Sequence, residues 1–418
     1  MFIKIAVNSL RNRKGSVVLT LLAMAVSIFV LLGVEHIRHQ VKESFANTVS
    51  GVDLIVGART GSLNLLLYSV FKVGSPTNNI SWPVFEDIAS RSDVKWAIPL
   101  SLGDSHKGYR VLGTTQAYFQ HFSYGKQHKL RFAQGTVFTR VFDVVLGSEV
   151  AKKLGYNLGD KLVLAHGIAN TSFSLHDDRP FTVVGILNPT GTPVDQTLHV
   201  SLQGIEAIHI DWRRGVKIPG SSITPEQLEQ AGFNNQLQPK SITAMMLGLK
   251  SRMITFRVQR DINNYSSEPL LAILPGVALS ELWQMMAILE DTLRLVSLLV
   301  LIAALFGLSA MLLASIRERN REIQLLRVIG APPSFLFLLI ELEALLISVG
   351  GILLGTGMLT ICLVVARDFL AVQFGLHMDI MVISADSFYL LLAIVTLTIF
   401  AAVIPSLYAY RGAKSLRQ

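Results

Sequence analysis

The sequence predicts a membrane protein with four transmembrane α-helices and a large α+β domain between the first and second spans. Of its 418 residues, 51% are hydrophobic and 16% are charged, and the mean hydropathy is +0.48. Soluble domains usually carry about 25% charged residues, whereas disordered chains combine low hydrophobicity with high net charge. The single cysteine, Cys362, excludes a disulfide framework and a cysteine-based zinc module. The net charge is +8, and the charged residues lie beside apolar segments. They therefore indicate a protein that contacts a membrane rather than nucleic acid.

Four segments are long and apolar enough to cross a bilayer, which takes about 20 mainly apolar residues. We place the transmembrane helices at 15–34, 295–316, 335–366 and 387–410. A cleaved signal peptide is the alternative interpretation of the first segment. Its apolar stretch is too long for one, and EHIRHQ follows where small residues should mark a cleavage site, so we expect it to be retained.

Basic residues in short flanking segments set the orientation of the spans. They gather before the first span, between the second and third, and after the fourth: Lys4, Arg11, Arg13, Lys14; Arg317, Arg319, Arg321, Arg327; Arg411, Lys414, Arg417. The segment 367–386 is acidic instead. We therefore expect residues 1–14, an amphipathic helix, together with 317–334 and 411–418 in the cytoplasm, and 35–294 and 367–386 on the outside.

The external segment 35–294 is long enough to bury a core of its own, and its charges are nearly balanced. The expected strands are 143–147, 161–165, 181–187 and 252–258, the expected helix is 148–154, and the expected boundary or loop is 213–242. We also expect the first span to continue as a helix to about Phe45, and a helix from 279 to lead into the second span. These two extensions would form a stalk.

The chain carries no recognisable catalytic motif. It has no G-x-x-x-x-G-K-[ST] phosphate loop, no G-x-S-x-G and no H-E-x-x-H. Scattered Ser, His and Asp residues are expected by chance in an external segment of this length. We therefore do not expect an enzyme, and any energy that the protein uses must come from another chain.

The most informative cytoplasmic segment is IRERNREIQLLRVIGAPP at 316–333. Glu318 and Glu322, like the arginines beside them, are i,i+4 neighbours on a helix that also has an apolar side. Gly330 suits a helix C-cap, and the two prolines prevent the helix from continuing. Two interpretations stay open: a helix that binds in a groove of a cytoplasmic partner, or a charged loop that only fixes the topology.

This segment resembles the signature E-R-x-R-E-I-x-x-x-x-x-x-G-A of the FtsX/MacB/LolCE permeases. The matching residues are Glu318, Arg319, Arg321, Glu322, Ile323, Gly330 and Ala331. The start NSLRNRKGSVVLTLL and the tail IPSLYAYRGAKSLR are similar to the ends of that family, and VVLGSEVAKKLGYNLGDKLVL and FTVVGIL resemble the MacB-like periplasmic core domain. The resemblance covers nearly the whole chain. Two features depart from the pattern: Pro332 and Pro333 replace basic or polar residues, and no ATPase domain is fused.

The resemblance implies the permease subunit of a mechanotransmission (type VII) ABC transporter in the bacterial inner membrane, with its large domain in the periplasm. Its implied partners are a cytoplasmic ABC ATPase dimer that binds ATP and magnesium, a second permease copy, membrane lipid and a periplasmic partner protein, with no nucleic acid. The residues implied in ATPase coupling are Glu318, Arg319, Arg321, Glu322, Ile323, Leu326 and Gly330. A homodimer is the simpler assembly, and a LolCE-like pair of different permeases is the alternative.

Two other functions remain open. A membrane-anchored periplasmic ligand sensor or receptor would usually need a cytoplasmic signalling domain, and the cytoplasmic segments are too short for one. A membrane-bound enzyme acting on lipid or cell wall would need a nucleophile or metal set, which the sequence does not show.

Small residues in the third span predict close helix packing, either at a dimer seam or within one bundle. These residues are Gly350, Gly351, Gly355 and Gly357. Glu341 and Glu343, near the start of the same span, could reach the interface or the coupling region, and we do not expect a catalytic role for them.

A zinc site is a further hypothesis. Glu35, His36 and His39 lie where the first span emerges on the outside, at helical spacings that bring side chains together. Imidazole and carboxylate groups suit zinc, and His377 with Asp379 lie in the other external loop. The segment GVDLIVGARTGSLNLLLYSVFKVGSPTNNI also resembles a MacB-like subgroup associated with zinc-related operons. The alternative is that these polar residues only mark the membrane boundary.

Overall fold

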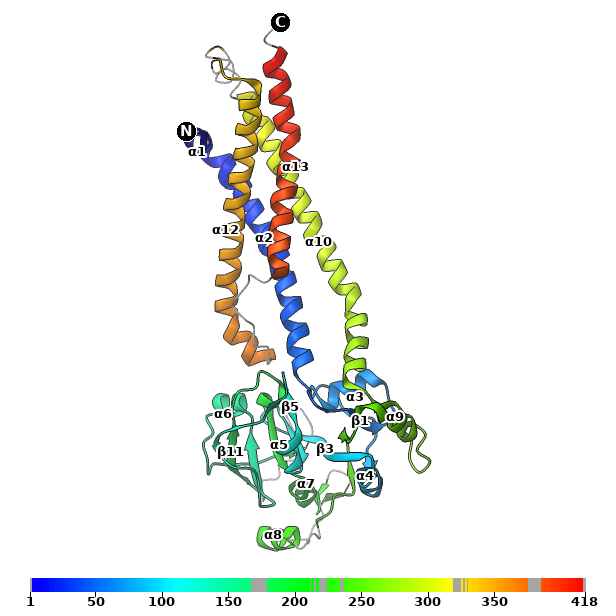
Figure 1. The fold of residues 1–418 in the computed structure, drawn as a ribbon. Coiled ribbons are helices and arrows are strands. Elements are labelled where there is room, and N and C mark those ends of the chain that lie inside the picture. The colour runs from blue at the N-terminus through cyan, green and yellow to red at the C-terminus, as the bar shows by residue number, and fades with distance from the viewer. Residues whose placement is uncertain are drawn as a thin grey trace. The chain divides into compact units, whose positions relative to one another are not determined.

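In the computed structural model the chain divides into two compact units (Figure 1). The membrane unit comprises Met1–Val41, Met286–Leu370 and Met378–Gln418, and the external unit comprises Lys42–Met285 and Ala371–His377. The structure describes residues 2–415 apart from 167–178, 211, 214–215, 218–223, 234–236, 319–324, 326–327, 329 and 375–384.

Four long helices of the described chain are apolar enough to span a membrane, which confirms the predicted number. They are α2 (Lys14–Asn47), α10 (Pro275–Glu318), α12 (Pro333–Phe374) and α13 (Ala385–Ser415), and a short helix, α1 (Phe2–Arg11), precedes them. The expected helical extensions beyond the first and second spans are present in α2 and α10. The expected loop at 367–386 is shorter than predicted, because α12 continues to Phe374 and α13 already begins at Ala385.

The glycines of the third span pack against α2 of the same chain. A Cβ built on Gly351 would lie 2.9 Å from Cβ of Met24, and one on Gly355 would lie 2.7 Å from the carbonyl oxygen of Ala25. A side chain at either position would therefore force the two helices apart. By contrast, no other described part of the chain comes within 4 Å of the corresponding position on Gly357, apart from the backbone of its own helix. Of the two open interpretations, the close contact within one bundle accounts for Gly351 and Gly355.

The external unit is built on one large mixed sheet. Its strand order is β17-β1-β16-β3-β4-β12-β8-β11-β7, with β10 paired to β3 and β9 paired to β11. The strands of this sheet are β1 (Leu54–Ala58), β3 (Val94–His106), β4 (Tyr109–Thr114), β7 (Phe132–Gly135), β8 (Asp143–Leu146), β9 (Lys161–Leu162), β10 (Ala165–His166), β11 (Phe181–Leu187), β12 (Thr197–Ser201), β16 (Ala244–Leu249) and β17 (Leu270–Ile273).

Short helices and hairpins cover this sheet, and large apolar clusters form its core. The helices are α3 (Ser62–Ser69), α4 (Trp82–Ala89), α5 (Ala117–His121), α6 (Ser148–Leu154), α7 (Leu202–His209), α8 (Pro225–Phe233) and α9 (Thr255–Asn263), with 3-10 turns at Pro193–Gln196 and Arg252–Ile254. The smaller strands are β2 (Ile80–Ser81), β5 (Ser123–Tyr124), β6 (His128–Lys129), β13 (Trp212–Arg213), β14 (Val216–Lys217) and β15 (Ser241–Ile242).

Most of the elements predicted for this unit are present in the structure. β8, α6 and β11 confirm the predictions for 143–147, 148–154 and 181–187, whereas the single strand expected at 161–165 is divided into the short strand β9 and the first residue of β10. The expected loop region 213–242 contains the last residue of β13 and all of β14, α8 and β15 among its described residues.

The strand expected at 252–258 is wrong, because these residues form a 3-10 turn followed by α9. The alternating pattern does not match burial: Met253 and Phe256 are 90% and 71% exposed. The buried side chains are instead those of Thr255, Val258 and Ile262, which are spaced three and four residues apart. This is the spacing of one helical face, and it becomes evident only when Ile262, beyond the predicted strand, is included.

Lys72 and His199 are among the basic side chains that are buried in the external unit. Lys72 is 9% exposed, and its Nζ donates to the carbonyl oxygen of Ser69 at 2.5 Å. Burial lowers the pKa of Lys72 to about 7. His199 is completely buried beside the rings of Tyr118 and Phe119. Burial, and secondarily the charge of Lys72, lowers the pKa of His199 to about 3. Both side chains are therefore most compatible with the fold when they are neutral.

This burial predicts a specific pH dependence of stability. Between pH 7 and about 10 the unfolded chain binds a proton at Lys72 that the folded chain does not, so the free energy of unfolding rises with pH. The contribution of this one group reaches up to about 1.4 kcal/mol per pH unit and vanishes below pH 7. Lys72→Met should remove it. Urea unfolding of the purified chain, followed by tryptophan fluorescence, measures this slope, because all four tryptophans lie in the external unit.

Lys240→Met is the matched control, since the Lys240 side chain is 88% exposed. It should leave the slope above pH 7 unchanged. An equal slope in wild type and Lys72→Met would show that folding does not lower the pKa of Lys72, which would contradict the prediction.

Candidate functional site

The predicted coupling segment lies between α10 and α12 of the membrane unit. Glu318 is the last residue of α10 and is exposed, and Gly330 has the positive φ of 101° that glycine adopts readily at a helix C-cap. Leu325 and Val328 are helical and are 62% and 85% exposed, so apolar side chains of this segment have no cover within the described chain. The other predicted coupling residues lie outside the described residues: Arg319, Arg321, Glu322, Ile323 and Leu326.

A buried contact joins the start of the chain to α12. Ser9 Oγ of α1 donates to Oε1 of Glu343 on α12 at 2.5 Å, and Glu343 is only 2% exposed. α12 is the helix that follows the coupling segment directly. The amphipathic helix α1 is thus bound to α12 through a carboxylate, and this gives Glu343 a structural role.

A network of ion pairs joins α2 to α10 beyond the predicted end of the first span. Glu35 accepts from Arg38 on its own helix and from Nη2 of Arg294 on α10 at 3.1 Å. Arg38 in turn lies 3.6 Å from the carboxylate of Glu290 on α10. The Glu35 and Glu290 side chains are 17% and 16% exposed. These four residues therefore hold the two helices together just beyond the uncharged runs of the first two spans.

Glu35, which belongs to this network, is also one of the three predicted zinc ligands. His36 is 7% exposed whereas His39 is exposed, so the two imidazoles have different environments. Among the described residues no three His, Cys, Asp or Glu side chains are grouped to hold a metal ion. His377 and Asp379 lie outside the described residues. Zinc binding by Glu35, His36 and His39 stays a prediction.

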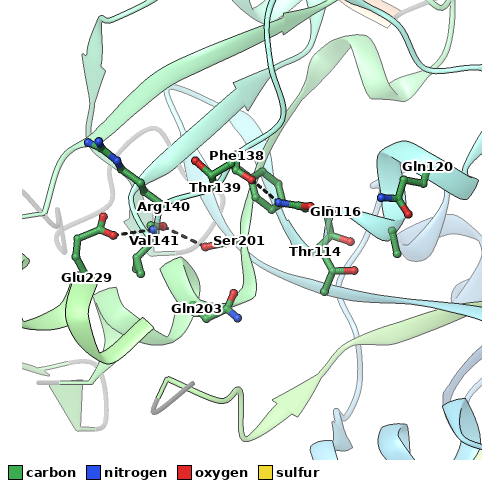
Figure 2. Close-up of a pocket in the computed structure, with 12 residues that line it drawn as sticks. Thr114, Gln116, Gln120, Phe138, Thr139, Arg140, Val141, Ser201, Gln203 and Glu229 are labelled. Atoms are coloured by element: carbon green, nitrogen blue, oxygen red, sulfur yellow. Dashed lines mark hydrogen bonds between the residues drawn. The ribbon is translucent and has the colours of Figure 1, made fainter. Parts of the chain in front are cut away.

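The external unit contains a polar cleft of about 480 Å³ that the sequence did not predict. It lies where two neighbouring parallel strands end, because Thr114 at the end of β4 pairs in register with Ser201 at the end of β12. In open α/β sheets, ligands bind outside the carboxyl ends of parallel strands. Figure 2 shows amide and hydroxyl side chains around this cleft, with the guanidinium of Arg140 at its margin.

Hydrogen bonds hold the walls of the cleft in place (Figure 2). Gln116 Nε2 donates to the carbonyl oxygen of Phe138 at 3.1 Å, and Ser201 Oγ donates to that of Val141 at 3.1 Å. The carboxylate of Glu229 accepts from the backbone amides of Val141 and Phe142 at 3.1 and 3.2 Å. This carboxylate is therefore engaged in the wall. The amide, hydroxyl and guanidinium groups of the lining suit the binding of a polar or anionic group.

Sequence reasoning missed this cleft because its lining comes from separate segments of the chain. Thr114, Arg140, Ser201 and Glu229 belong to different elements, and no motif connects them. Only the pairing of β4 with β12 brings their ends together. A signal for the cleft would have required the strand order, which the sequence pattern does not reveal.

Sequence comparison identifies two domains in the chain. Residues 17–233 match the MacB-like periplasmic core domain, and residues 294–413 match the FtsX-like permease C-terminal domain. No curated protein gives a significant sequence match. Among solved structures, the periplasmic region of MacB from Actinobacillus actinomycetemcomitans is similar, with a TM-score of 0.35 and 11% identity over 56% of this chain and 94% of that chain.

The extracellular domain of the ABC-type transporter YknZ from Gram-positive bacteria is similar with a TM-score of 0.29 and 11% identity, over 53% of this chain and 98% of that chain. These two similarities are too weak to carry an argument of their own. The sequence matches to the two domains cover the first span and most of the external unit, and then the remaining three spans. The chain therefore belongs to the family of FtsX-like ABC transporter permeases with a MacB-like periplasmic core domain.

Proposed function

We propose that this permease couples ATP hydrolysis by a separate cytoplasmic ATPase to conformational work of its external domain. The work would be export, extraction of a molecule from the membrane, or activation of a periplasmic partner. The proposal places the chain in the bacterial inner membrane with both termini in the cytoplasm. The basic flanks of the spans support this orientation, because positive residues are retained on the cytoplasmic side.

The observation that carries the proposal is the continuity of α10. This single helix of 44 residues begins at Pro275, directly after β17, and ends at Glu318, where the predicted coupling segment starts. α2 leads in the opposite direction toward β1, and β1 pairs with β17 in the sheet. Both helices therefore connect to neighbouring strands at one edge of the external sheet. A displacement of the coupling segment would reach that edge through unbroken helix.

The ion pairs between α2 and α10 support a joint movement of the two helices. Glu35 and Arg294 connect them directly, and the pair of Arg38 with Glu290 adds a second connection. Partly exposed pairs contribute about 1 kcal/mol or less each. They are thus strong enough to align the helices and weak enough to rearrange during a transport cycle.

Exposed apolar side chains support docking of a partner at the coupling segment. Leu325 and Val328 lie between Glu318 and Gly330, close to the charged residues that the family signature contains. A short helix with such side chains suits a groove on an ATPase. The charges would then determine specificity, since like charges brought together at an interface cost several kcal/mol.

Charge reversal in the coupling segment tests this proposal. We expect Glu322→Arg, alone or with Arg321→Glu, to uncouple the complex without preventing membrane insertion. The reversal would place like charges opposite each other in the groove of the ATPase and lower its recovery with the permease by about tenfold or more. The measurement is co-purification with the P-loop ATPase encoded nearest to this gene, followed by ATPase activity of the recovered complex.

Glu226→Arg is the matched control, because Glu226 is an exposed glutamate on α8 of the external unit. This variant should retain wild-type recovery and activity. Normal coupling and normal recovery in Glu322→Arg would contradict the proposed role of the segment.

The proposal also predicts the composition of the complex. Four spans provide half of an ABC membrane module, so we expect two copies of this chain and two ATPase subunits. Native mass spectrometry of the purified complex measures this directly. A second, different permease chain in place of the second copy would indicate a LolCE-like heteropair instead.

The alternative of a ligand sensor is favoured by one observation, the polar cleft at the ends of β4 and β12. Its volume of about 480 Å³ lies in the range of small-molecule sites. A bound ligand there is also compatible with a permease that works on its external partner. Recovery of the permease without any ATPase would favour the sensor.

Zinc binding is a secondary proposal for the outer end of α2. If Glu35, His36 and His39 bind zinc, the double variant His36→Ala/His39→Ala should lose that binding. Calorimetric titration of the purified permease with zinc measures it. The control is His128→Ala, since His128 lies on β6 of the external unit and is exposed. Equal zinc affinity in wild type and double variant would leave these histidines as boundary residues.

A further inference from the structure

A small hollow lies between the beginning of α2 and the end of α10, within the membrane unit. Its volume is about 220 Å³, and it is lined by residues of both helices and of the turn before α2. Two opposite charges line it, Arg13 and Glu318. Hydroxyl groups of Ser16, Thr20 and Ser315 lie among them. The volume is below that of a typical drug-sized site, so the hollow suits a small polar group.

The hollow changes character with depth. Arg13 and Glu318 flank the uncharged runs 15–34 and 295–316, which places them where the apolar spans end. Leu19 and Met311 line the same hollow six and seven residues further into the spans, or about 10 Å at the rise of an α-helix. Leu19 is 71% exposed. The hollow is thus charged at the level of lipid headgroups and apolar at the level of the acyl chains.

The charges at the mouth distinguish among lipid headgroups. A guanidinium binds phosphate through charge-assisted hydrogen bonds, which are stronger than those between neutral groups. The carboxylate of Glu318 can only accept, so it requires a donor of positive charge. A headgroup that carries phosphate alone would satisfy Arg13 but would be repelled by Glu318. The quaternary ammonium of phosphatidylcholine would be attracted by the Glu318 carboxylate, but it has no N–H that could donate a hydrogen bond to it.

We propose that this hollow is a binding site for phosphatidylethanolamine, with the lipid phosphate at Arg13, the primary ammonium at Glu318 and an acyl chain along Leu19 and Met311. The serine and threonine hydroxyls supply neutral hydrogen bonds around the headgroup. The hydroxyl of Thr20 already donates to the carbonyl oxygen of Ser16 at 2.9 Å, so its oxygen can still accept a hydrogen bond. The proposal does not depend on an ATPase.

Lipid titration of the purified full-length permease tests the site. The delipidated protein in detergent is titrated with phosphatidylethanolamine, phosphatidylcholine and phosphatidylglycerol of identical acyl chains, and bound lipid is counted by native mass spectrometry. Wild type should prefer phosphatidylethanolamine by about tenfold, which is the effect of one charged hydrogen bond. Soluble glycerophosphoethanolamine should not compete at equal concentration, because it lacks the acyl chain.

Two variants separate the roles of the charges. Arg13→Gln should weaken phosphatidylethanolamine and phosphatidylcholine alike by about tenfold, because both carry the phosphate. Glu318→Gln should weaken phosphatidylethanolamine most, weaken phosphatidylcholine less because only an attraction between charges is lost, and increase the affinity for phosphatidylglycerol. Lys14→Gln and Arg317→Gln are the matched controls, since these charges neighbour Arg13 and Glu318 in sequence but do not line the hollow.

Equal affinity of wild type for the three lipids would overturn the proposal, and this result needs no variant to fold. Unchanged lipid preference in both Arg13→Gln and Glu318→Gln would also overturn it, as would full competition by glycerophosphoethanolamine. Because the assay contains the permease alone, these results are distinct from a failure of ATPase coupling.

Discussion

A backbone amide inside a bilayer has no water to bond with, so every span of this protein must be an unbroken helix. α2 and α10 extend this regularity past the apolar runs, to Asn47 at one end and from Pro275 at the other. They lead into β1 and out of β17, which pair antiparallel with Ile55 opposite Ile273. The two helices thus connect along the chain to neighbouring strands of the external sheet. The proposed role of the permease in transmitting movement depends on this connectivity.

The spans could be predicted from the sequence because the membrane imposes the same requirement on every residue of a span. The external unit could be predicted only in part, since its elements are short and their packing decides between alternatives. The segment 252–258 alternates like a strand, but Val258 and Ile262 form one buried helical face. For the same reason the polar cleft was not predictable, because Thr114 and Ser201 meet only through the pairing of β4 with β12. The glycines of the third span indicated close packing, and the contact of Gly355 with α2 identifies the partner.

The structure shows two obstacles to zinc binding by Glu35, His36 and His39, one energetic and one geometric. The carboxylate of Glu35 is engaged by Arg38 and Arg294. Metal binding would have to displace these pairs, but partly exposed ion pairs contribute only about 1 kcal/mol each. That cost is small beside the affinity of a complete zinc site. The stronger constraint is geometric, because a closed site needs four converging ligands and an open one needs three. The different exposure of His36 and His39 is therefore the more serious obstacle.

The charges near the coupling segment fall into two environments, and this separation has a mechanical consequence. Glu343 is buried and held by Ser9, so it fixes α1 against α12 regardless of the surroundings. Glu318 is exposed at the end of α10, although Ser315 and Ile316 just before it are buried. Only the exposed side of this helix end is open to another molecule. A phospholipid between Arg13 and Glu318 would connect the start of α2 to the end of α10 at that level. The stiffness with which α10 transmits movement would then depend on the lipid composition of the membrane.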